Sequence, residues 1–395
     1  MNADQTLLSK RIVSIDILRG LVMIIMALDH TRDFFHIDAM TSDPLNPDTT
    51  SGILFFTRWI THFCAPTFVF LSGLSAYLSA QNKTAAQASS FLFKRGVWLI
   101  FVEIVIFTLG LTFNPMYNFI ILQVIWAIGC SMIFLAIFSR ISYKLVLVLG
   151  IILVFGHNLF NLFPVPKDEN LSIVLKVFFT AFGTVIPLGD NHFVGAFYAI
   201  LPWTGIMFLG CAAGKWFSKD YNPIKRNRNL LNFGALALVL FVALRLLSFY
   251  GDPSPRKEYH DLAKNLLSFF NVSKYPPSLQ YTSLTIGVAL LLLAMFEGVK
   301  NKASKVLSIY GSVPFFYYII HFYLLHTILI ALFFLEGNTT AQIVQMPFWF
   351  RPVAFGYNLW IVYAIWLLVV ASLYYPCKWF KKYKETHQNW WLRYL

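Results

Sequence analysis

The sequence has few charged residues and few cysteines. Only 12% of its 395 residues are charged, against the roughly 25% that soluble domains carry, and this excludes an ordinary soluble protein. Its four cysteines are scattered and form no CxxC pair. We therefore expect thiols packed in the core rather than disulfides or zinc ligands.

Several catalytic motifs are also absent. The chain has no Walker A loop, no GxGxxG, no GxSxG elbow and no HExxH. Nucleotide hydrolysis and serine-hydrolase chemistry therefore have no support, and no metal site is expected.

Apolar sequence is abundant, because hydrophobic residues make up 58% of the chain and aromatic residues 18%. We expect an all-α polytopic membrane protein with about ten spans of about 20 apolar residues each. These spans are expected to form a single integral-membrane domain over residues 1–395. They are predicted at 13–36, 53–80, 91–112, 119–138, 144–162, 193–214, 230–250, 279–297, 306–333 and 356–377.

The positive charge is distributed as in a membrane protein. The net charge is +13, but Lys and Arg gather in loops expected on one side, such as 215–228 and the C-terminal KKYK. This placement predicts cytoplasmic N- and C-termini and a lipid bilayer as partner rather than nucleic acid. The apolar stretch 171–188, interrupted by Lys176, Gly183 and Pro187, is interpreted as an interfacial or re-entrant helix.

The first predicted span is unusual in its charge. A charged side chain at the bilayer centre costs roughly 2.5–3.5 kcal/mol on insertion scales. We therefore expect this helix to carry chemistry or a pathway rather than to serve only as an anchor. Its ionisable residues are Asp16, Arg19, Asp29, His30, Arg32 and Asp33.

Histidines gather towards the side expected to face outward. Imidazole, with a pKa of about 6.5, suits proton transfer near neutral pH. His30 follows Asp29 and lies one turn from Asp33, and either carboxylate could orient its ring as a general base. A structural contact between helices is the alternative. His36 ends the span and is interpreted as an interfacial residue or as the alternative base.

Other polar residues are predicted at the same depth in the membrane as His30. His62 can serve either helix packing or the site. His321 and His326 are five residues apart, which is poor spacing for one helix face, so at most one is expected beside His30. The candidate substrate-binding residues are Arg32, His62, Asn158, Tyr281 and His321.

The cytoplasmic side has its own candidates. Asp16 and Arg19 are three residues apart and can pair on one helix face, either as a self-neutralised pair or with Arg19 meeting an anionic ligand. Lys94 and Arg95 could meet phosphate groups, although the positive-inside rule already explains them. Glu103 lies in mid-span and needs a partner. The candidate cofactor-binding residues are Asp16, Arg19, Lys94 and Arg95.

A series of motifs resembles the heparan-α-glucosaminide N-acetyltransferase-like family of bacterial membrane proteins. This family belongs to the transmembrane acyltransferase superfamily, alongside acyltransferase family three. The resemblance begins with SIDILRG and LDHTRDFFH in the first span and covers nearly the whole chain. Later stretches agree in order: HFCAPTFVFLSG (62–73), YAILPWTGIMFLG (198–210), KYPPSLQY (274–281) and GSVPFFYYIIH (311–321).

The resemblance implies a ten-helix acetyltransferase in the bacterial cytoplasmic membrane. Its donor would be cytoplasmic acetyl-CoA, and its acceptor an amine or hydroxyl of a sugar or glycan on the outer side. The family's catalytic histidine maps onto either His30 or His36, and acyltransferase family three favours His30. Direct transfer, an acetyl-histidine intermediate and a homodimer all stay open. The alternative function is a proton-coupled transporter, since buried Asp, Glu, His and Arg also serve proton relays.

Overall fold

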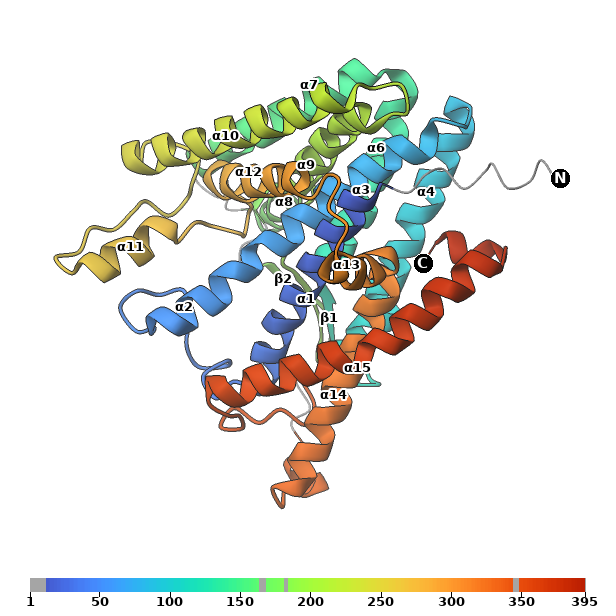
Figure 1. The fold of residues 1–395 in the computed structure, drawn as a ribbon. Coiled ribbons are helices and arrows are strands. Elements are labelled where there is room, and N and C mark those ends of the chain that lie inside the picture. Colours follow the sequence, from blue (N-terminus) through green and yellow to red (C-terminus); the bar gives the residue numbers. More distant parts are fainter. Residues whose placement is uncertain (1–11, 163–167, 181–183, 344–347, 395) are drawn as a thin grey trace.

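A computed structural model describes residues 12–162, 168–180, 184–343 and 348–394 of the chain, and most of these residues are helical (Figure 1). The α-helices are α1 Val13–Phe35, α2 Gly52–Trp59, α3 Cys64–Ala80, α4 Ala85–Val102, α5 Thr108–Thr112, α6 Val124–Ile141, α7 Tyr143–Gly156, α8 Glu169–Leu175, α9 Ile200–Ala213, α10 Pro223–Leu247, α11 Leu262–Phe270, α12 Leu279–Met295, α13 Lys302–Ser312, α14 Pro314–Leu335 and α15 Leu359–Thr386. Short turns complete the set: 3₁₀ helices at Ile60–Phe63, His157–Leu162, Gly214–Phe217, Thr340–Gln342 and Trp390–Arg393, and π-helices at Glu103–Phe107 and Lys176–Thr180.

The described residues include six helical segments that are long and apolar enough to cross a membrane, which makes the chain an integral membrane protein. The helix α1 is not among them, because its aspartates and arginines interrupt the apolar sequence. The count of ten spans and the cytoplasmic termini therefore stay predictions. The six segments are Gly52–Ala80, Val124–Ile141, Tyr143–Leu162, Pro223–Leu247, Pro314–Leu335 and Leu359–Thr386.

The prediction of an all-α fold is wrong in one region. The strands β1 Phe119–Leu122, β2 Thr184–Gly189 and β3 His192–Ala196 form a three-stranded sheet in the order β1-β3-β2. β1 is parallel to β3, and β2 is antiparallel to it. Predicted spans 119–138 and 193–214 therefore begin as strands. Short apolar runs of this kind fit a buried strand as well as a helix, so periodicity cannot separate the two.

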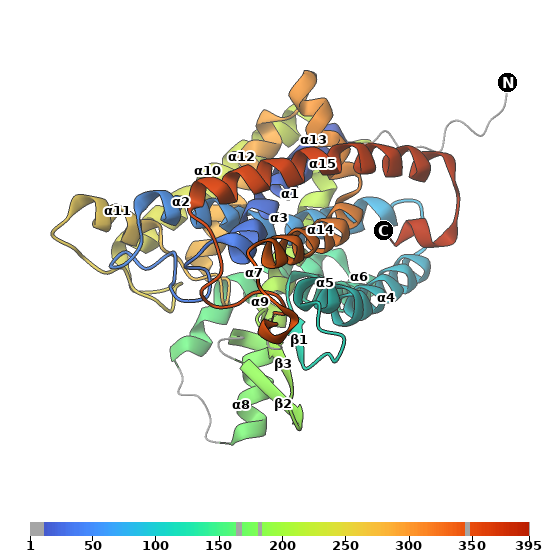
Figure 2. The ribbon, with the colours of Figure 1, turned by 90° about the horizontal axis from the view of Figure 1, so that it is seen from below.

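The ambiguous stretch 171–188 is helical only in part. It contains the end of α8 and the π-helix Lys176–Thr180, and it then continues in β2 from Thr184. The expectation of a helix is therefore wrong from Thr184 onward. In Figure 2, α8, β2 and β3 project together from the helical body.

The predicted span 306–333 is broken into α13 and α14. The break lies at Val313, with φ −134° and ψ 49°, directly before Pro314, which begins α14. A residue before proline disfavours the helical conformation, which explains the break. It allows α13 to pack on α1 while α14 takes a separate course (Figure 1).

The helix α1 contacts α3, α13, α14 and α15. Two glycines permit its close approach to α13. A Cβ on Gly20 would lie 1.9 Å from the Leu307 carbonyl oxygen, and one on Gly311 would lie 1.9 Å from that of Asp16. Small residues allow this kind of backbone contact between membrane helices. The contact places the N-terminal half of α1 in a fixed position.

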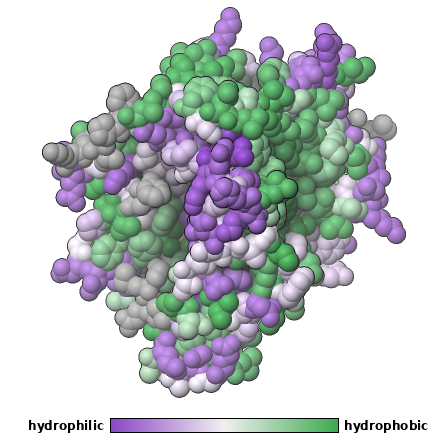
Figure 3. Space-filling model, turned by 90° about the vertical axis from the view of Figure 1, so that its left-hand side faces the viewer, coloured by the Kyte–Doolittle hydropathy of each residue, from purple (hydrophilic) through white to green (hydrophobic). Residues whose placement is uncertain are grey.

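The core consists of apolar side chains, and all four cysteines are buried and free, as the sequence predicts. The surface is mixed. On the side of the molecule where α2 and α11 lie, Figure 3 shows hydrophilic surface flanked by hydrophobic surface.

Candidate active site

The helix α1 contributes ionisable residues to two places, one near each of its ends. At the N-terminal end lies a cavity of about 340 Å³ between α1, α3, α4, α6, α14 and the C-terminal segment. Its cations are Arg19, Arg95 and Lys384, and its hydroxyls include Ser72, Ser75, Ser79 and Ser312. The rest of the lining is mostly apolar, with Met23, Leu99 and Ile128 among its members.

Arg19 is held in place by several polar contacts. Its Nη1 lies 3.2 Å from Asp16 Oδ1 and donates to the Gly311 carbonyl oxygen at 3.1 Å, while Nη2 donates to Ser75 Oγ at 3.0 Å. The predicted pairing of Asp16 with Arg19 is therefore confirmed. Asp16 fixes the arginine, and the arginine lines the cavity.

Arg95 and Lys94 are neighbours on α4 but differ in position. Arg95 lines the cavity and is half-buried, whereas Lys94 is exposed and is not a lining residue. The Arg95 Nε has no hydrogen-bond partner within the described ranges. Of the four predicted cofactor-binding residues, the structure thus brings Arg19 and Arg95 to one cavity, with Asp16 behind them, and leaves Lys94 outside.

The same cavity reaches Tyr318, which lies beside His30. The ring centroids of His30 and Tyr318 are 6.3 Å apart in an edge-on contact, and those of His30 and Phe322 are 4.4 Å apart. Sequence reasoning did not identify Tyr318 as a site residue. The signal available was its place in the motif GSVPFFYYIIH, three residues before His321.

His321 also lies next to His30, with ring centroids 5.3 Å apart. Its Nδ1 is 2.7 Å from the Tyr318 carbonyl oxygen. A carbonyl can only accept, so Nδ1 carries the hydrogen. The Nε2 of the neutral ring is then an acceptor, and it has no partner among the residues described.

His326 lies elsewhere, as the spacing of the two histidines predicts. Its ring stacks on Phe113 with centroids 4.0 Å apart, and its Nε2 hydrogen-bonds the Trp349 carbonyl oxygen at 3.1 Å. The expectation that at most one histidine of this pair lies beside His30 is confirmed.

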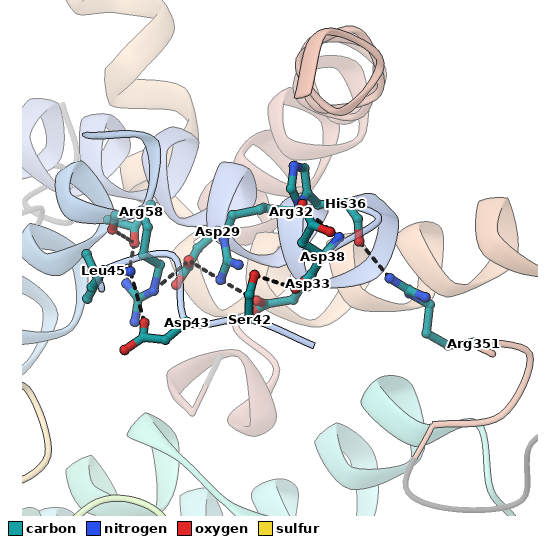
Figure 4. A network of polar contacts seen from close by, with 11 residues as sticks. Asp29, Arg32, Asp33, His36, Asp38, Ser42, Asp43, Leu45, Arg58 and Arg351 are labelled. Carbon is teal, nitrogen blue, oxygen red and sulfur yellow. Dashed lines mark hydrogen bonds and ion pairs between the residues drawn. The ribbon is translucent and has the colours of Figure 1, made fainter. Parts of the chain in front are cut away.

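A network of ion pairs surrounds the C-terminal end of α1 (Figure 4). Asp29 Oδ1 lies 3.5 Å from Arg32 Nη2 and 3.6 Å from Arg58 Nε. Arg32 also pairs with Asp33, and Arg58 donates to Thr61 Oγ1 at 2.7 Å. Arg58 comes from α2, so the network holds α2 against α1.

The predicted contact in which a carboxylate orients the His30 ring by accepting a hydrogen bond from it is not seen. Within the described segments, neither Asp29 nor Asp33 hydrogen-bonds the His30 ring, and both pair with Arg32 instead. Asp29 is three residues before Arg32 and so shares its helix face. The half-buried ring of His30 is instead positioned by Tyr318, His321 and Phe322.

His36 is buried in the turn that ends α1. Its Nδ1 accepts from the Asp38 backbone N–H at 3.3 Å, and its carbonyl oxygen accepts from Arg351 Nη2 at 2.7 Å. The segment around Tyr357 pairs with its backbone. These contacts give His36 a part in holding the 348–358 segment on α1, apart from the ring cluster around His30.

The remaining candidates belong to helix contacts. The buried ring of His62 lies edge-on to Tyr281 at 5.3 Å, and the Tyr281 hydroxyl donates to the His62 carbonyl oxygen at 2.7 Å. Asn158 Oδ1 accepts from the Leu279 N–H at 2.9 Å, which fixes the start of α12. Neither ring nitrogen of His62 has a hydrogen-bond partner among the described residues, while its ring packs on Tyr281.

No cluster suited to a metal is present in the described part of the chain, since it contains no group of three or more His, Cys, Asp or Glu side chains that could hold an ion.

The fold and the site define an integral membrane protein in which a cavity with three cations ends beside a histidine. A family model described as heparan-alpha-glucosaminide N-acetyltransferase, catalytic, matches residues 11–251, and the chain belongs to this family. Membership implies acetyltransferase activity and gives no support to a transporter. A comparison with curated proteins finds no match. The matched range ends before α11, so Tyr318, His321 and Lys384 lie outside it.

Proposed function

We propose that the protein transfers an acetyl group from cytoplasmic acetyl-CoA to an amine or hydroxyl of a sugar or glycan on the outer side of the membrane. The observation that carries this proposal is the cavity that runs from Arg19, Arg95 and Lys384 to Tyr318, next to His30. The protein would lie in the bacterial cytoplasmic membrane with both termini inside.

The cavity suits the two chemical parts of the donor. Arginine and lysine bind phosphate through charge-assisted hydrogen bonds, so the nucleotide phosphates would lie at Arg95, Arg19 and Lys384. The pantetheine arm is less polar and would lie along side chains such as Leu99 and Ile128. The volume of about 340 Å³ is within the range of about 300–1,000 Å³ usual for ligand pockets.

His30 is the base that we assign to the transfer. The acceptor nitrogen or oxygen attacks the acetyl carbon, the carbon–sulfur bond breaks, and the acceptor's proton passes to His30. A positioned base contributes about 10²–10⁴-fold to a rate. His30 could also carry the acetyl group as an intermediate, with His321 Nε2 as the neighbouring proton acceptor. His36 is the weaker candidate because its contacts are those of a turn.

The acceptor would approach from the C-terminal end of α1. Asp33 is the accessible member of the ion-pair network, with its side chain 48% exposed, against 13% for Asp29 and 6% for Arg32. An exposed carboxylate can hold the ammonium group of an amino sugar, while the buried members keep the helices together.

Acetyl-CoA binding to detergent-purified protein tests this proposal, measured by calorimetry with coenzyme A and ATP as controls. We expect acetyl-CoA and coenzyme A to bind better than ATP, and radiolabelled acetyl groups to reach an amino sugar. Folded protein that binds neither coenzyme would overturn the proposal, and substrate accumulation in proteoliposomes without coenzyme would favour a transporter.

A further inference from the structure

Glu103 is a buried acid that the proposed transfer leaves without a role. It is 1% exposed and begins the π-helix Glu103–Phe107 between α4 and α5. One carboxyl oxygen, Oε1, accepts from the Gln123 backbone N–H, and the other, Oε2, has no hydrogen-bond partner within the described ranges. No cation pairs with it there either.

This environment favours an uncharged side chain. An ionised carboxylate buried without a cation is strongly unfavourable, whereas a carboxylic acid needs only ordinary hydrogen bonds. A protonated Glu103 fits this site, because its carbonyl oxygen would accept from the Gln123 backbone N–H. Its hydroxyl is then available to donate a proton. Single π-helical turns inside α-helices occur frequently at functional sites.

A second, small cavity lies between Glu103 and Tyr318. It has a volume of about 10 Å³ and is lined by Glu103, Thr108, Gln123, Tyr318, Phe322 and apolar neighbours. A volume of about 10–15 Å³ is the least that holds one water molecule. Tyr318 lines both this cavity and the larger one that we assign to acetyl-CoA.

Tyr318 therefore lies between Glu103 and the place where the thioester would react. Its ring contacts His30 on α1 and packs edge-on to Phe107 in the π-helix, with centroids 4.4 Å apart. Its carbonyl oxygen also holds His321. No described residue hydrogen-bonds the Tyr318 hydroxyl. No hydrogen bond within the described protein therefore has to break before this hydroxyl can donate its proton.

We propose that Glu103 and Tyr318 form a proton-transfer pair that protonates the departing thiolate of coenzyme A. As the carbon–sulfur bond breaks, its electron pair goes to sulfur, and the Tyr318 hydroxyl gives its proton to the thiolate. Glu103 replaces that proton through one water in the small cavity and is left as a carboxylate. It takes up a proton again once the thiol has left. The acceptor's own proton goes to His30.

This inference rests on the proposed function, and its test compares two acetyl donors. Glu103→Gln keeps the shape and the acceptor for Gln123 but cannot donate the acidic proton, and Tyr318→Phe removes the hydroxyl alone. The matched control is Tyr323→Phe on the same helix, because Tyr323 donates to the Ile106 carbonyl oxygen and lines neither cavity. The donors are acetyl-CoA and the acetyl thioester of thiophenol, whose thiolate is a better leaving group.

We expect Glu103→Gln and Tyr318→Phe each to lower kcat with acetyl-CoA by roughly 100-fold, the lower end of acid–base effects. Acetyl-CoA affinity and the activity of Tyr323→Phe should stay close to wild type. With the thiophenol donor the loss should shrink to a few-fold, because its thiolate needs no proton to leave. The double variant should be no slower than either single one, since both act in one transfer.

Two results would overturn the inference while leaving acetyl transfer intact. One is wild-type kcat in both folded variants, and the other is an equal loss with both donors, which would mean a structural effect. If wild-type protein binds no acetyl-CoA and transfers no acetyl group, the proposed function and this inference both fail. Should Glu103→Gln not fold, Tyr318→Phe alone decides between these outcomes.

Discussion

The two ends of α1 use the same residue types for different purposes. At the C-terminal end, Asp29 and Asp33 both pair with Arg32, and Asp29 also lies beside Arg58. At the N-terminal end, Arg19, Arg95 and Lys384 line the cavity, and Asp16 pairs with Arg19.

The difference is instructive for charges inside membrane proteins. Balanced ion pairs neutralise each other and connect helices, so they need no ligand. Cations that line an open cavity can bind an anion there through charge-assisted hydrogen bonds. We therefore propose the cavity at the N-terminal end for an anionic coenzyme, and we expect the C-terminal network to serve mainly the architecture.

The largest effect is expected at His30, which lies beside Tyr318 where the cavity ends. We expect His30→Ala to lower acetyl transfer by at least about 100-fold, because a positioned base is lost, while acetyl-CoA affinity stays within a few-fold. Steady-state transfer and calorimetry measure both. His36→Asn is the control, and a larger loss of transfer in that variant than in His30→Ala would reverse our assignment.

The next test compares neighbouring cations on α4. Arg95→Met should weaken acetyl-CoA binding by roughly 10-fold to 100-fold, since a hydrogen bond to a charged group contributes about 1.5–3 kcal/mol. Lys94→Met should leave the Kd unchanged, because Lys94 is exposed and lies outside the cavity. Calorimetric titration of both variants measures the difference. Equal effects would show that general surface charge, not the cavity, attracts the coenzyme.

A change in the balanced network should affect stability more than coenzyme binding. Arg58→Met leaves Asp29 with one cationic partner and removes the contact to Thr61. We expect the free energy of unfolding to fall by about 2 kcal/mol, less than the 3–5 kcal/mol of a buried pair broken completely. Thermal unfolding in detergent measures this. The account would be wrong here if acetyl-CoA affinity fell while stability did not.

The smallest effect is expected at the exposed pair of Asp48 and Lys257, which belongs neither to the cavity nor to the ion pairs of Asp29. The Lys257 side chain holds the pKa of Asp48 below its ordinary value of 3.8 through a hydrogen bond of 2.8 Å. This pair therefore adds stability above pH 3.8, and the contribution disappears as the pH falls through the lowered pKa. Asp48→Asn should lower the unfolding temperature slightly at pH 7 and not at all in strong acid. A constant difference at every pH would contradict this.

The sequence predicts the site best where the relevant geometry is local. The spacing of Asp16 and Arg19 predicts their pair, and the spacing of His321 and His326 predicts that only one lies beside His30. Both statements depend on the helix period alone, and both are confirmed. The expected contact of His30 with Asp29 is not seen, because Asp29 pairs with Arg32 on its own helix and with Arg58 from another.

Features that depend on distant segments are not visible in the sequence. Nothing local shows that Tyr318 would join two cavities, or that Lys384 would fold back to the Arg19 end of α1. The strands β1 and β3 lie in apolar runs that also fit helices, and their pairing joins residues far apart along the chain. The break before Pro314 is the exception, because a proline directly after Val313 was a readable signal.

A cryo-electron microscopy map of the protein with a non-cleavable acetyl-CoA analogue, in which a ketone replaces the thioester, tests the central claim most directly. The account predicts nucleotide phosphates beside Arg19, Arg95 and Lys384, and an acetyl group that reaches Tyr318 and His30. Coenzyme bound elsewhere, or bound in this cavity with its acetyl group directed away from His30, would contradict it.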